Sequence, residues 1–166
     1  MKFTHFALAA VVAVAAAAGT LALGGKEAAP TVDYTLLDGS RHRSDELRGK
    51  VVLVNFWATS CTTCMKEMPA LVETHRKYQG RGLETLSVAM SYDVPGYIAN
   101  YVQSRQLPFQ VTHDRSGQIA QQFGKVQLTP TTFVLNRRGE IVKRYVGEPD
   151  FQQLNALLED LLAQKA

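Results

Sequence analysis

The chain is poor in cysteine, histidine and tryptophan: of its 166 residues two are Cys, four are His and one is Trp. The histidines His5, His42, His75 and His113 include no pair separated by three to five residues. A structural zinc site needs four ligands, commonly two pairs of cysteines or one such pair with two spaced histidines. Structural zinc is therefore excluded, and two cysteines cannot form a framework of several disulfides.

The chain also lacks a large excess of charge. Lys and Arg number 18 against 15 Asp and Glu, a formal net charge of +3. The one local basic cluster, residues 41–50, contains Asp45 and Glu46 and is typical of a solvated face. Without a strongly basic domain or a recognition motif, nucleic-acid binding is not expected.

Charged residues are missing altogether from residues 6–25. Twenty uncharged residues can cross a hydrocarbon core of about 30 Å as a helix. An apolar run after the basic Lys2, with small residues near its end, is equally typical of a cleaved secretory signal. We expect residues 1–25 to be a signal peptide or an N-terminal membrane anchor and residues 26–30 to be a linker. With Lys2 inside, either interpretation places residues 31–166 in the periplasm.

Residues 31–166 read as one α/β domain in which strands alternate with helices. Ser44 resembles a helix N-cap, and the β-branched run of residues 51–56 is typical of a central strand buried on both faces. The pattern predicts a mixed sheet flanked by helices, with a late antiparallel hairpin. Strands are expected at 32–36, 51–56, 83–90, 109–112, 131–135 and 140–146, and helices at 44–47, 64–80, 97–102, 116–123 and 151–162.

Both cysteines lie in the stretch WATSCTTCMKEMP, residues 57–69. As a structural staple, a ring this small would add only about 2 kcal/mol, against about 3 for fifteen residues. As copper(I) ligands, Cys61 and Cys64 would need Met65, Met68 or a histidine, and Met68 also fits a core position at helical spacing. As a redox pair, the motif fits a Cys-x-x-Cys near a βαβ unit.

The redox interpretation has local support. A strand that runs through a short loop into a helix places Cys61 at the helix N-terminus, where unpaired N–H groups stabilise a thiolate. Cys64 follows one turn later, on a neighbouring face. Cys61 is then the exposed attacking thiolate and Cys64 the covered resolving thiol.

Residues 51–69 resemble the active-site region of the thioredoxin superfamily, and in particular its TlpA/ResA-type thiol–disulfide oxidoreductases. The resemblance implies a thioredoxin-like fold with an N-terminal hairpin and a central insertion. It also implies that Pro130 is a cis-proline facing the disulfide, with the Thr129 backbone pairing with a substrate peptide. Trp57 and Ser60 would lie on the substrate-binding surface. Ser60 departs from the family, which usually has Trp there, as Thr62-Thr63 departs from the common Gly-Pro pair.

Glu67 lies three residues after Cys64, on the same helical face. In the ResA-type branch a glutamate at this spacing assists proton transfer, and burial would raise its pKa toward neutrality. Asn55 occupies the position of the buried aspartate of ordinary thioredoxins, which leaves Glu67 as the only carboxylate expected near the cysteines. Pro69 is expected to kink the helix.

The resemblance implies a periplasmic reductase of protein disulfides that needs no cofactor or metal beyond Cys61 and Cys64. Its partners would be client proteins with disulfides or cysteines, such as apocytochrome c or copper-site proteins, and an inner-membrane electron donor of the DsbD/CcdA type. A thiol oxidase or isomerase with the same residues, and a copper(I)-binding module, remain alternatives. A peroxiredoxin-like motif is missing, because Val54 and Ala58 stand where it needs Pro and Thr or Ser.

Overall fold

The computed structural model describes residues 26–164. The predicted signal or anchor at residues 1–25 lies outside this range. Within it, no helix is both long enough and apolar enough to span a bilayer.

The elements follow the predicted order closely. The strands are β1 (Asp33–Thr35), β2 (Arg41–Arg43), β3 (Val51–Trp57), β4 (Leu83–Ala89), β5 (Gln110–His113), β6 (Thr131–Leu135) and β7 (Ile141–Val146). The helices are α2 (Thr62–Tyr78), α3 (Pro95–Arg105), α4 (Gln118–Gln122) and α5 (Phe151–Ala163), with the 3₁₀ turns η1 (Ser44–Leu47) and η2 (Gln79–Arg81).

The central sheet has the strand order β5-β4-β3-β6-β7. Strands β3, β4 and β5 are parallel, and β6 and β7 are antiparallel to their neighbours. Every residue of β3 is buried, as its continuous apolar run predicts for a strand covered on both faces. The prediction of a thioredoxin-like α/β fold with a mixed sheet is confirmed.

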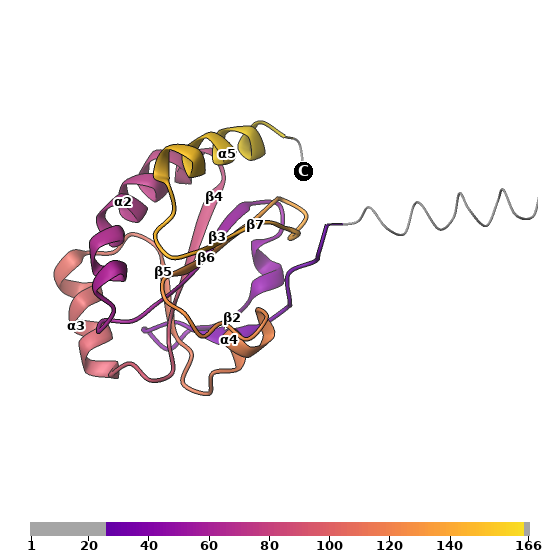
Figure 1. The fold of residues 1–166 in the computed structure, drawn as a ribbon. Coiled ribbons are helices and arrows are strands. Elements are labelled where there is room, and N and C mark those ends of the chain that lie inside the picture. The colour runs from indigo at the N-terminus through magenta and orange to yellow at the C-terminus, as the bar shows by residue number, and fades with distance from the viewer. Residues whose placement is uncertain (1–25, 165–166) are drawn as a thin grey trace, which may run out of the picture.

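Alternation along β3 divides its side chains between two cores. Val51, Leu53 and Trp57 pack into one cluster with residues of α2, α3 and α5, whereas Val54 and Phe56 pack against the hairpin, η1 and α4. Figure 1 shows α2, α3 and α5 on one side of the sheet and α4 with β2 on the other. Asn55 lies on the same face of β3 as Leu53 and Trp57, so its polar side chain points from the central strand toward α2.

The hairpin and the central segment expected from the resemblance are both present. The β1–β2 hairpin forms a separate two-stranded sheet, and the central segment 91–125 supplies the edge strand β5. The two are joined where Leu36 bridges Thr112 and where the Tyr34 hydroxyl donates to Gln110 Oε1 at 2.7 Å. The central segment therefore completes the sheet.

Two local predictions need correction or refinement. Ser44 is not an N-cap, because Arg43 takes that position and Ser44 Oγ accepts a bond from Val32 N at 2.9 Å. Residues 26–30, expected as a linker, lie against the last hairpin: Ala29 N donates to Gly139 O at 2.9 Å.

Candidate active site

The disulfide lies at the junction between the end of β3 and the start of α2. After Trp57 the chain turns, with Cys61 N donating to Ala58 O at 3.1 Å, and α2 begins at Thr62 with Cys61 as its N-cap. Cys61 Sγ accepts a hydrogen bond from Cys64 N at 3.1 Å, and the two residues form a disulfide with their Cα atoms 5.2 Å apart. A thiolate at Cys61 would meet the free N–H groups and the positive end of the helix.

The two sulfurs differ in exposure. Cys64 is fully buried, whereas Cys61 is partly exposed at the edge of the core. This is the asymmetry predicted for an attacking and a resolving cysteine. Only Cys61 presents surface to a large disulfide substrate.

Glu67 lies behind the disulfide on the same helix, with 2% of its surface exposed. Asn55 Nδ2 donates to Glu67 Oε1 at 3.1 Å and to Thr132 Oγ1 at 3.0 Å. Burial raises the Glu67 pKa from 4.5 to about 7, although the bond from Asn55 acts in the opposite direction. Glu67 Oε2 has no partner among the described residues. This carboxyl group can therefore take up or release a proton near neutral pH.

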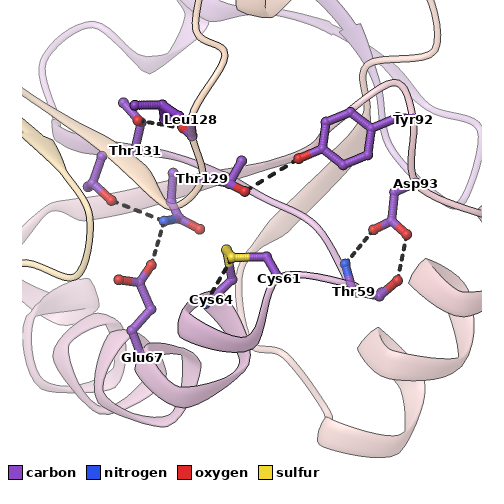
Figure 2. The surroundings of a disulfide bond; sticks show 11 residues. Thr59, Cys61, Cys64, Glu67, Tyr92, Asp93, Leu128, Thr129 and Thr131 are labelled. Carbon is purple, nitrogen blue, oxygen red and sulfur yellow. Dashed lines mark hydrogen bonds between the residues drawn. A yellow bond between two sulfur atoms is a disulfide. The ribbon is translucent and has the colours of Figure 1, made fainter.

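The peptide bond between Thr129 and Pro130 is cis, as the resemblance implied. Pro130 is buried and Thr129 is partly exposed, and both lie directly before β6, which pairs with β3. Figure 2 shows Thr129 beside the disulfide, and its Oγ1 lies 3.3 Å from the Tyr92 hydroxyl.

Asp93 is a second buried carboxylate near the site, which corrects the expectation that Glu67 stands alone. Its Oδ2 accepts from Thr59 N at 2.6 Å and its Oδ1 accepts from Thr59 Oγ1 at 2.5 Å (Figure 2). Parallel strands end at the same edge of a sheet, so the loop after β4 lies beside the loop after β3. From the sequence, this rule could have predicted that Asp93 and Tyr92 lie near the active-site turn.

The remaining predicted site residues divide between surface and interior. Ser60 is exposed beside Cys61. Trp57 is fully buried with its ring centroid 5.5 Å from that of Tyr101, so a direct substrate contact does not fit its position. It belongs to the core cluster that includes Cys64 and against which Cys61 packs. Helix α2 continues through Pro69 to Tyr78.

A copper(I) site at the two cysteines would need a further ligand from Met65, Met68 or a histidine. No group of three or more His, Cys, Asp or Glu side chains within residues 26–164 gathers at one point. Met68 is a core residue, and His75 is buried with Nδ1 3.1 Å from Thr85 Oγ1. Burial lowers the His75 pKa, as for a neutral histidine of the core.

A thioredoxin-like sheet, a Cys-x-x-Cys disulfide capping a helix and a cis-proline beside it together define a thiol–disulfide oxidoreductase. The chain belongs to the Redoxin family, whose sequence model matches residues 24–158. Among similar proteins, the thiol-disulfide oxidoreductase ResA of Bacillus thuringiensis subsp. konkukian is 34% identical over 138 residues. The match covers 82% of this chain and 78% of that protein. ResA of Bacillus anthracis is 35% identical with the same coverage.

Solved structures agree with this assignment. A thioredoxin-like protein from Neisseria meningitidis superposes with a TM-score of 0.76 at 36% identity, covering 82% of this chain and 91% of that one. A thiol:disulfide interchange protein from Chlorobium tepidum gives a TM-score of 0.77 at 23% identity, covering 84% and 99%. The second likeness shows the fold alone. The protein is thus a ResA-like thiol–disulfide oxidoreductase with a Cys61–Cys64 pair.

Proposed function

We propose that the protein reduces disulfides of client proteins in the periplasm. The observation that carries the exchange chemistry of this proposal is the buried Glu67 carboxyl on the same helical face as the buried Cys64. A buried thiol is hard to ionise, yet Cys64 must lose its proton before it can resolve a mixed disulfide. A carboxyl with a pKa of about 7 is suited to accept that proton.

In the reductive direction, the Cys61 thiolate attacks one sulfur of the client disulfide. A Cys61–client bond forms and the other client sulfur leaves as a thiolate. Cys64 then gives its proton to Glu67 and attacks Cys61, which releases the second client thiol and closes the Cys61–Cys64 disulfide. One client thiolate takes a proton from Glu67 and the other takes one from solvent, so the client gains two electrons and two protons overall. An inner-membrane donor of the DsbD/CcdA type would restore the dithiol.

The predicted export segment, residues 1–25, and the similarity to ResA proteins support a periplasmic setting. Periplasmic compartments are oxidising, so a reductase there needs a dedicated electron supply. Clients of the proposed kind carry cysteines that must be reduced before a group is attached, such as apocytochrome c or copper-site proteins.

One observation favours the opposite direction as a second candidate. The N-cap position of Cys61 stabilises its thiolate, and a stabilised reduced form makes a stronger oxidant. Glu67 can accept the Cys64 proton during reduction and return it during oxidation, so the redox potential of the Cys61–Cys64 couple distinguishes the two directions.

Mixed-disulfide trapping tests the proposed function. Reduced Cys64→Ser should retain a covalent client at Cys61, whereas Cys61→Ser should neither trap clients nor reduce insulin disulfides. Insulin reduction that survives Cys61→Ser would contradict the mechanism. A trap that captures only a membrane donor would contradict the role in client reduction.

A further inference from the structure

Position 60 carries a serine where the resemblance leads to a flat aromatic residue, so the surface next to Cys61 lacks that side chain. The loop after β4 supplies another aromatic at the same edge of the sheet. Tyr92 is 58% exposed and lies three residues beyond the end of β4. An exposed aromatic at the sheet edge that also carries the reactive cysteine needs a physical reason, because its burial would be favourable.

The loop that carries Tyr92 is fixed to the active site on two sides. Asp93, its neighbour, is buried and holds Thr59 through both carboxylate oxygens. The Tyr92 hydroxyl lies 3.3 Å from Thr129 Oγ1, next to the cis-proline. Figure 2 shows Tyr92 reaching toward Thr129 above the disulfide.

Backbone contacts confirm that these loops meet at one edge. Met90 N donates to Trp57 O at 2.9 Å, and Phe56 is paired with Thr131. The segments that follow β3 and β4 and the one that precedes β6 therefore converge there. Tyr92 spans the distance between the Thr59 side and the Thr129 side of this edge.

The ring is held in place by its hydroxyl while much of its surface faces solvent. Leu128, one residue before Thr129, is 66% exposed. Two apolar side chains thus project from the loops that carry the proposed peptide-binding residue and the anchor of the active-site turn. Pre-ordered apolar surface binds a partner at a smaller entropic cost than surface on a free loop.

We propose that Tyr92 is a specificity-determining residue that binds the apolar or aromatic side chain flanking a client cysteine. It replaces the aromatic that position 60 lacks. The occupant is an extended client segment with an apolar residue next to its cysteine. This inference rests on the proposed function, since it concerns how a protein disulfide is chosen.

The test compares three disulfides: two homodimeric peptides, with Phe or with Gly beside the cysteine, and hydroxyethyl disulfide. Second-order rate constants are measured with the reduced protein. The wild type should prefer the Phe peptide, and Tyr92→Ala should lower that rate about fivefold while leaving the other two unchanged. Tyr92→Phe should keep a smaller preference than the wild type, because the ring that makes the contact remains but loses the hydroxyl that holds it in place. Leu37→Ala, which removes an exposed apolar side chain from the β1–β2 turn, is the matched control and should change nothing.

Equal loss on all three disulfides would show a structural effect and overturn the proposal, as would an unchanged Phe-peptide rate in Tyr92→Ala. A wild type that reduces both peptides at equal rates would overturn the role of Tyr92 and leave the reductase function intact. A wild type that reduces hydroxyethyl disulfide but neither peptide would overturn both.

Discussion

Asn55 on the central strand holds Glu67 on the active-site helix, with Asn55 Nδ2 donating to Glu67 Oε1 at 3.1 Å. The second proton of the same amide goes to Thr132 Oγ1 on β6, so the amide orientation is fixed from two sides. Because the amide donates to Glu67, it stabilises the ionised carboxylate, while burial favours the neutral acid. The balance places the Glu67 pKa near 7.

Replacing Glu67 with Gln should slow disulfide exchange at least about tenfold, because the amide keeps the bond from Asn55 but cannot accept the Cys64 proton. Stopped-flow reduction of insulin or a model peptide measures the rate. The pH profile of Cys61 alkylation should also lose an inflection near pH 7. Glu73→Gln, on the exposed face of the same helix, is the control. Unchanged kinetics in Glu67→Gln would assign Glu67 a purely structural role.

Glu67 should also make stability depend on pH. Its folded pKa of about 7 lies above the ordinary 4.5, so between these values the folded state binds more protons than the unfolded state. The stability that Glu67 contributes is therefore complete below about pH 4.5 and lost as pH rises through 7, a loss of about 1–3 kcal/mol. Urea unfolding of oxidised protein at pH 5 and pH 8 measures it.

Glu67→Gln is neutral at both pH values, so its stability relative to wild type should rise between pH 5 and pH 8. Parallel curves for the two proteins would contradict the raised pKa.

Asp93→Asn should loosen the turn that precedes Cys61. The Asp93 carboxylate accepts hydrogen bonds from the backbone N–H and the hydroxyl of Thr59 and from Val94 N. In the Asn variant one of the two accepting oxygens is replaced by an NH2 group, which would face another hydrogen-bond donor. We expect a loss of about 1–3 kcal/mol in the free energy of unfolding. Amide exchange of residues 58–61 should become faster. Thr59→Val keeps the backbone bond and should show a smaller effect; equal losses in both variants would assign the anchor to the hydroxyl alone.

Arg137→Lys should destabilise the fold without changing redox chemistry. The guanidinium donates to Gly49 O at 2.7 Å, Gln164 O at 3.1 Å and Leu162 O at 3.2 Å, joining the β3 entry to the end of α5. An ammonium group cannot reach all three carbonyls, so about 1–2 kcal/mol should be lost. Arg138→Lys, whose exposed guanidinium pairs with Glu140, should cost far less. A loss of the same size in both would show that Arg137 has no special role.

The sequence sufficed where local pattern determines structure. The β-branched run of β3 and the helical spacing after Cys64 predicted both elements, and the cysteine spacing predicted the disulfide. Contacts between segments that are distant in the sequence could not be predicted in this way. The hydrogen bond that Asp93 accepts from Thr59 joins residues 34 positions apart. Trp57 was expected on the substrate-binding surface, but it packs against Tyr101 in the core. Ser44 does not cap the helix, because its hydroxyl accepts a hydrogen bond from Val32 N in a preceding segment.

The redox potential of the Cys61–Cys64 couple tests the central claim most directly. Equilibration with dithiothreitol or glutathione buffers, followed by alkylation of free thiols, gives the value. A protein-disulfide reductase should lie near the thioredoxin potential, at about −270 mV or below. A potential at or above about −180 mV, in the range of protein disulfide isomerase and stronger oxidants, would contradict the reductase function and favour thiol oxidation.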